Sequence, residues 1–84
     1  MYITEEQKGE KVKEVISRAK ELLFRAELVN KGMHVHAIIS CMSVIKLGLK
    51  LYEGEITYNS EGYCVLDTES KRLAGLLYYT EHKL

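Results

Sequence analysis

The 84-residue sequence contains no proline and no tryptophan, and it has no excess of charge of either sign. Twelve Lys and Arg residues balance twelve Asp and Glu residues, which excludes the strongly basic character of nucleic-acid-binding proteins and polybasic membrane anchors. Long hydrophobic runs are also absent, because the longest uncharged apolar stretch, residues 37–45, is far shorter than the roughly 20 residues that span a membrane. We therefore expect a single soluble domain, residues 1–84, with no membrane contact.

The sequence also lacks the marks of export. Its first six residues include two glutamates and no basic residue, whereas a secretory signal begins with basic residues and continues with apolar ones. Cysteine is scarce, and Cys41 and Cys64 do not form the CxxC pair that is typical of redox and zinc motifs. These features predict a cytoplasmic protein with two reduced, partly buried thiols.

Motifs of common enzyme classes are missing as well. The six glycines form neither of the glycine-rich patterns that bind nucleotide phosphates, and no serine stands in a G-x-S-x-G setting. Cys41 lies among apolar residues, which would raise the pKa of its thiol and block access to it. The acidic residues near the predicted turns are expected to be solvated: Glu53, Glu55, Glu61, Asp67 and Glu69. We therefore expect no enzymatic activity and no cofactor.

A helical pattern is present near the N-terminus. Thr4 and Gln7 have the spacing of a capping box, in which each side chain bonds to the backbone of the other residue. Apolar residues then recur every three or four positions from Val12 to Val29, and Gly32 can adopt the left-handed conformation that ends a helix. The pattern predicts an amphipathic helix over about residues 4–31.

The middle of the chain is unusually apolar, with eleven apolar residues between Val35 and Leu51. We expect a second helix over about residues 36–47, buried over most of its circumference, that passes into an extended segment near Leu49. The alternative is two short strands, residues 34–37 and 46–51, because apolar and other residues alternate strictly in the second of these segments.

After Gly54 the composition favours strands. Residues 55–58 suit a pleated surface, residues 59–62 suit a hairpin loop, and residues 63–66 suit a partner strand. A polar turn over 67–71 and an apolar return over 72–79 extend the pattern. The predicted fold class is α+β, with both helices packed on a three- to four-stranded antiparallel β-meander over about residues 49–80.

Tyrosine makes up six of the seven aromatic residues, and four tyrosines fall in the predicted sheet. Tyr78 and Tyr79 are adjacent and would face opposite sides of a strand, so one of the two is expected to point outward. We expect these tyrosines to bind a protein partner: Tyr58, Tyr63, Tyr78 and Tyr79. The predicted function is a small non-enzymatic regulatory or inhibitory protein–protein interaction module.

Self-association is part of this hypothesis. Residues 35–51 carry more apolar surface than a domain of this size can readily shelter, and pairing of two copies would cover the excess. A homodimer is therefore expected. The apolar stripe of the first helix could also pair between copies as a short coiled coil.

His34 and His36 could form part of a zinc or copper site if the backbone between them is extended. The candidates for a third ligand are Cys41, Cys64, His82 and Asp67, and none stands at a recognisable ligand spacing. We therefore expect no bound metal.

Two other functions stay as alternatives. The hairpin over residues 67–71 could act as the wing of a nucleic-acid-binding regulator, although nearby acidic residues would repel phosphate. The segment Gly32-Met33-His34, followed by an apolar run and later by Asp67-Thr68-Glu69-Ser70, resembles the phosphocarrier family HPr. That resemblance implies a phosphate-accepting histidine at His34 and a regulatory serine at Ser70, but His36 and Ala37 replace the Arg and Pro of the family.

Overall fold

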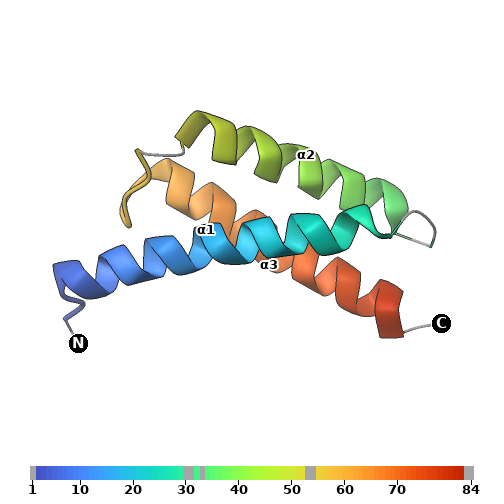
Figure 1. The fold of residues 1–84 in the computed structure, drawn as a ribbon, viewed down its shortest axis with the longest axis horizontal. Coiled ribbons are helices and arrows are strands. Elements are labelled where there is room, and N and C mark those ends of the chain that lie inside the picture. The colour runs from blue at the N-terminus through green and yellow to red at the C-terminus, as the bar shows by residue number, and fades with distance from the viewer. Residues whose placement is uncertain (1, 30–31, 33, 53–54, 83–84) are drawn as a thin grey trace.

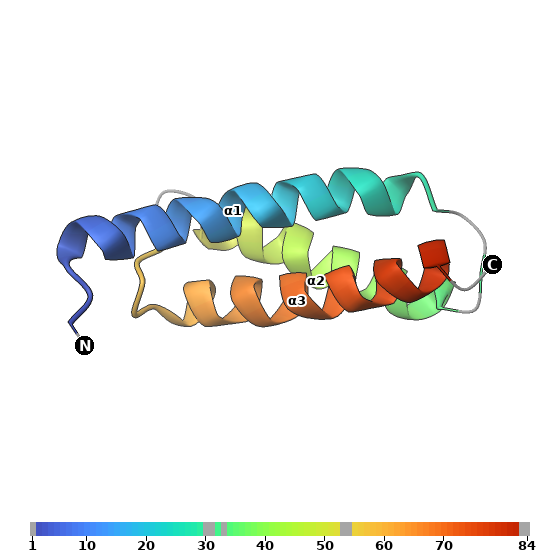
Figure 2. The same ribbon diagram turned by 90° about the horizontal axis from the view of Figure 1, so that it is seen from below.

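The computed structural model describes residues 2–29, 32, 34–52 and 55–82. These residues form three helices: α1 (Glu5–Glu27), α2 (Val35–Tyr52) and α3 (Glu61–His82). Figure 1 shows that α1 and α3 run in the same direction. Helix α2, which lies between them in the sequence, runs in the opposite direction. In Figure 2, α1 lies over the other two helices. Helix α3 packs extensively against both α1 and α2, whereas α1 and α2 contact each other less.

The first helix begins at the predicted capping box. The Thr4 backbone N–H donates to Gln7 Oε1 at 2.9 Å, and the Gln7 N–H donates to Thr4 Oγ1 at 3.1 Å. The helix ends at Glu27, several residues before the predicted stop. Gly32 does adopt a φ of 126°, but it belongs to the connection that follows rather than to the helix end. Asn30 and Lys31, which were expected in the last turn, lie outside the described residues.

The second helix is longer than predicted. It continues through residues 46–51, where strict alternation had suggested an extended segment or a strand. Gly48 lies inside this helix and packs closely against α3, since a Cβ at Gly48 would lie 3.2 Å from Leu66 Cδ2. The alternative strand at 34–37 is also wrong, since the Ile38 N–H donates to the His34 carbonyl at 2.9 Å, as in a helix.

The predicted α+β fold class and its β-meander are wrong, because the described residues contain no strand and residues 61–82 form one helix. Within α3 the fully buried side chains recur at intervals of three and four: Leu66, Ser70, Leu73 and Leu77. This is the period of a helix with one buried face. The β-favouring residues at 56–58 and 63–65 masked that period. The expected hairpin loop at 59–62 is instead the helix start, where Ser60 Oγ accepts from the Tyr63 N–H at 3.1 Å.

One core joins the three helices. Its members are small or branched aliphatic side chains and one thiol: Val15, Ala19, Leu22 and Ala26 of α1, Ile38, Cys41, Ile45 and Leu49 of α2, and Leu66, Leu73 and Leu77 of α3. Ion pairs between helices lie at the edges of this core. Arg25 of α1 contacts Glu81 of α3 at 2.9 Å, and Lys46 of α2 contacts Glu27 of α1 at 3.5 Å. The two pairs attach α1 to both of its neighbours.

Candidate protein-interaction surface

The side of α2 that faces away from α1 and α3 carries large apolar side chains. Four are exposed: Ile39 by 53%, Val44 by 38%, Leu47 by 57% and Leu51 by 60%. Val44, Leu47 and Leu51 follow one another at helical spacing, and Ile39 lies one turn before Ser43 along the same side. Four polar residues complete this surface: His36, Ser40, Ser43 and Lys50, all exposed. We call these eight residues the outer face of α2.

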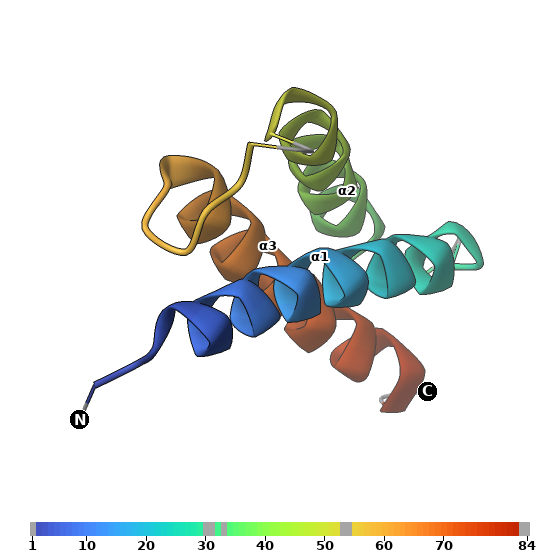
Figure 3. The same cartoon turned by 60° about the vertical axis from the view of Figure 1, so that its left-hand side comes forward.

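The outer face is uncovered because α2 packs at the edge of the molecule. Its opposite side holds Ile38, Cys41 and Ile45, which are at most 1% exposed in the core. Figures 1 and 3 show no other described element beyond α2 on its outward side. The prediction of a helix buried over most of its circumference is therefore wrong. The apolar residues outnumber the positions that two neighbouring helices can cover, and the surplus lies on the surface.

The charge of α2 is of one sign. Residues 35–52 contain no Asp or Glu, and both lysines, Lys46 and Lys50, lie in the second half of the helix. Lys46 reaches Glu27 of α1, which places it on the flank of the outer face next to α1. Among the described residues, α2 is also the one helix whose length and composition would suit a membrane span, a test that core helices of soluble proteins also pass.

The four tyrosines predicted to bind a partner do not form one surface. Tyr58 and Tyr63 pair at the start of α3, with ring centroids 5.1 Å apart, and both are half-buried. Tyr78 and Tyr79 lie near the other end of α3, about 22 Å away by helical rise. They are consecutive on a helix, so they do not face opposite sides of a strand as expected. Each of these two is more than half exposed, and the Tyr79 ring lies 6.3 Å from that of His34.

Burial raises the pKa of Tyr63, and the neighbouring Asp67 carboxylate adds to this shift. Asp67 is itself held by two cations: Arg18 of α1 at 3.4 Å and Lys71 of α3 at 3.1 Å. This cluster therefore links the start of α3 to α1. It is a stabilising contact between helices, and Tyr63 is half-buried beside it.

The two cysteines lie in different surroundings. Cys41 is in the core, where burial raises the pKa of its thiol and the nearby Glu69 carboxylate raises it further, against a smaller opposite effect of Arg72. A thiol held protonated and enclosed in this way is a poor nucleophile. Cys64, in contrast, is exposed on α3, so the expectation that both thiols are partly buried is wrong.

The histidines and acidic residues form no metal site among the described residues. His34 and His36 lie at the start of a helix rather than on an extended segment. Their side chains therefore do not point to the same side, as they would on a strand. Asp67 pairs with cations, and Cys41 is buried in the core. The side chain of His82 and the whole of Glu53 lie outside the described part of the chain.

The structure also bears on the two alternative functions. Residues 67–71, the expected wing of a nucleic-acid-binding regulator, form part of α3 rather than a hairpin. Ser70, the regulatory serine implied by the resemblance to HPr, is completely buried, and its hydroxyl donates to the Asp67 carbonyl at 3.1 Å. The predicted wing is therefore wrong. His34, the other residue that the resemblance to HPr implies, is partly exposed, so a phosphate-accepting role for it stays a prediction.

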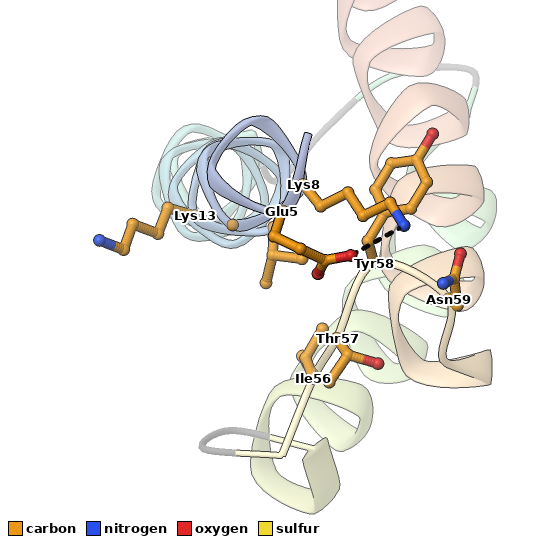
Figure 4. A pocket seen from close by; sticks show the side chains of 9 residues that line it. Glu5, Lys8, Lys13, Ile56, Thr57, Tyr58 and Asn59 are labelled. Atoms are coloured by element: carbon orange, nitrogen blue, oxygen red, sulfur yellow. Dashed lines mark hydrogen bonds and ion pairs between the residues drawn. The ribbon is translucent and has the colours of Figure 1, made fainter. Parts of the chain in front are cut away.

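A pocket of about 380 Å³ lies between the start of α1 and the segment that leads into α3 (Figure 4). Its lining combines polar and apolar side chains: Glu5, Lys8, Val12, Lys13, Ile56, Thr57, Tyr58 and Asn59, with Gly9. Figure 4 shows the Lys8 ammonium against the Glu5 carboxylate, 3.3 Å apart, with the Tyr58 ring beside it. The one carboxylate in the lining is thus paired with a lysine, and the lining includes neither histidine nor cysteine. This is not an arrangement for nucleophilic or general acid–base chemistry.

The sequence did contain the signal for the outer face of α2. His36, Ser40, Ser43 and Lys50 lie on one stripe at helical spacing, and the apolar residues beside this stripe are the ones that the structure leaves exposed. No family model matches the chain, and searches of curated proteins and of solved structures find no match either.

Proposed function

We propose that the protein is a non-enzymatic protein–protein interaction module that forms a homodimer through the outer face of α2. The observation that carries the proposal is the exposure of Ile39, Val44, Leu47 and Leu51 on one side of one helix. Apolar residues scattered singly over a surface need no explanation, whereas a continuous group of them is typical of an interaction site.

Several features of the outer face favour association with a protein. Burying a complete Leu or Ile side chain contributes about 1.5–3 kcal/mol, so the exposed parts of four such side chains per copy are a substantial driving force. Two of the polar residues within the face are serines, and Ser43 Oγ already donates to the Ile39 carbonyl at 3.0 Å. Its hydroxyl can lose water without losing its hydrogen bond, so burial of Ser43 costs little.

A non-enzymatic role remains our prediction, and three groups that could carry chemistry are engaged within the fold. The buried Cys41 thiol is enclosed, the pocket near α1 holds a paired carboxylate, and Ser70 is bonded to its own helix. A protein of this kind acts by occupying a surface.

Replacement of Leu47 with lysine tests the proposal, because it puts a charge at the centre of the outer face. We expect the wild-type protein to be a dimer by size-exclusion chromatography with light scattering, and Leu47→Lys to be a monomer with an unchanged helical circular dichroism spectrum. The matched control is Leu28→Lys. Leu28 is 73% exposed, comparable to Leu47 at 57%, but it lies at the end of α1 outside the outer face.

Leu28→Lys is expected to remain dimeric. A wild-type protein that is monomeric at all concentrations would contradict the proposal. So would a dimer that Leu47→Lys leaves intact, because the copies would then associate through another surface.

A further inference from the structure

We infer that the two copies pair α2 against α2 in antiparallel orientation, about a two-fold axis that passes between Ser43 and Val44. This inference rests on the proposed homodimer and adds its geometry. In such a pair, residue 36 of one copy lies opposite residue 51 of the other, and residue 40 lies opposite residue 47.

The sizes of the exposed side chains support this orientation. On the outer face, the first half of α2 carries His36, Ser40 and Ser43 with Ile39 at one edge, and the second half carries Val44, Leu47 and Leu51 with Lys50 at the same edge as Ile39. Antiparallel pairing places each leucine of one copy against a smaller or polar residue of its partner. Large side chains then fill the space above small ones, and the helices can approach to the usual 8–10 Å. Parallel pairing would instead place serine against serine and leucine against leucine.

The length of the helix gives the same register independently. Helix α2 runs from Val35 to Tyr52, so its midpoint lies between Ser43 and Val44. Two antiparallel copies therefore overlap along their whole length when the axis passes through that point. Full overlap buries the largest part of the outer face, and it coincides with the register in which Leu47 meets Ser40.

Charge also favours the antiparallel arrangement. Helix α2 contains two lysines, Lys46 and Lys50, and no Arg, Asp or Glu, and both lysines lie in its second half. Parallel pairing would bring four ammonium groups together at one end, and it would align the two helix dipoles. Antiparallel pairing leaves two ammonium groups at each end and opposes the dipoles, which is the favourable arrangement.

A lipid surface is the main competing occupant, because α2 has the length and composition of a membrane-associated helix. The middle of the outer face argues against it. His36, Ser40 and Ser43 would lie in the acyl region together with the apolar side chains, where His36 and the Ser40 hydroxyl would lose water without gaining a partner. Opposite a second copy of α2, His36 lies at one end of the paired helices, next to solvent.

Cross-linking of single cysteines with a short bis-maleimide tests the orientation. All variants carry Cys64→Ser, which removes the exposed thiol, whereas Cys41 is 1% exposed and out of reach of the reagent. Ser43→Cys lies beside the proposed axis, so it should link to the same position of the other copy in either orientation. This variant shows whether the outer faces meet. Thr68→Cys, exposed on α3, gives the background.

His36→Cys and Leu51→Cys distinguish the two orientations. In the antiparallel pair, position 36 of one copy meets position 51 of the other. The two copies of position 36 lie about 22 Å apart along the helix axis, as do the two copies of position 51. We expect cross-linked dimer when the two variants are mixed, and none above the Thr68→Cys background when either is treated alone. Light scattering confirms that each variant is still a dimer before treatment.

Other results would overturn the inference. Links of 36 to 36 and of 51 to 51 in the separate variants would show parallel pairing and leave the proposed homodimer standing. No link at Ser43→Cys in a protein that still dimerises would place the interface elsewhere. A monomer that sediments with vesicles of anionic phospholipid, and loses this binding in Leu47→Lys, would show a lipid surface as the occupant and would overturn the homodimer too.

Discussion

At the scale of single residues, Cys41 shows how one position can depend on the whole core. The thiol belongs to α2, but the groups that act on it, Glu69 and Arg72, belong to α3. Burial is the largest cause of the raised pKa of this thiol. The Glu69 carboxylate raises the pKa further, because a thiolate next to another negative charge is unfavourable. Nothing in the residues around Cys41 in the sequence indicates Glu69 as its neighbour.

The raised pKa of Cys41 predicts a loss of stability in alkaline solution. The thiol ionises in the unfolded chain near pH 9.0 but only at higher pH in the folded protein, so the folded state binds more protons above pH 9. Its contribution to stability is complete below that pH and falls as pH rises, by up to about 1.4 kcal/mol per pH unit for one group. Urea unfolding at a series of pH values under reducing conditions measures the decline.

Cys41→Ala should lower stability at neutral pH and make the decline above pH 9 shallower. Cys64→Ala is the matched control, because it removes the exposed thiol and keeps the buried one. Equal slopes in the wild-type protein and in Cys41→Ala would show that the buried thiol does not contribute.

At the scale of elements, α3 shows why the local composition misled. Its first turns contain tyrosine and valine, which favour strands, and its start resembles a hairpin loop. Packing decides the outcome, because Leu66, Leu73 and Leu77 can all enter one core only if the segment is helical. The intrinsic preferences of residues for helix or strand contribute less free energy than the burial of three leucine side chains.

Two glycines of α3 give a test of this packing with a single kind of substitution. A Cβ at Gly62 would lie 2.6 Å from Tyr52 Cγ and 3.0 Å from Tyr52 Cβ, at the base of that side chain, whereas a Cβ at Gly75 would meet nothing within 4 Å. We expect Gly62→Ala to destabilise the protein by about 1–3 kcal/mol through overpacking. Gly75→Ala should stabilise it by about 0.5–1 kcal/mol through helix propensity.

Urea unfolding of both variants at one protein concentration measures these changes. Because the substitution is the same and both positions lie in one helix, opposite signs identify the Tyr52 contact as the cause. A stabilising effect at both positions would mean that α2 and α3 do not approach each other closely near Gly62.

At the scale of the whole molecule, three helices form a thin body. Its principal extents are 42, 27 and 16 Å, and each helix contributes one face to a single core. A layer of this kind covers one side of α2 and leaves the other side to solvent. The outer face of α2 is therefore a property of the arrangement of the three helices as well as of the composition of that one.

If two copies cover this face, the stability of the protein must depend on its concentration. Association of folded chains stabilises them by mass action, so we expect the thermal midpoint of the wild-type protein to rise with protein concentration. Leu47→Lys should unfold at a midpoint that does not change with concentration, whereas Leu28→Lys should behave as the wild-type protein does. Circular dichroism at 222 nm in cells of different path length measures this, and a constant wild-type midpoint would argue against dimerisation.

The amino-acid sequence alone determines the first helix and the presence of an apolar surplus. Thr4 and Gln7 form the capping box that their spacing indicates, and the stripe of α1 that enters the core is the one that the three–four repeat marks. These features are local, so they can be read within a few turns of helix. The excess of apolar residues between 35 and 51 is likewise a matter of composition.

Only the tertiary structure decided the rest. Residues 55–80 have local preferences for strands, and their helical period becomes clear only when α1 and α2 offer a core for Leu66, Leu73 and Leu77. Which apolar residues of α2 stay outside was equally open, because the sequence does not show on which sides of α2 the other helices pack. Long-range contacts settle both questions. Burial of each leucine stabilises the fold by more free energy than the local conformational preferences of the neighbouring residues contribute.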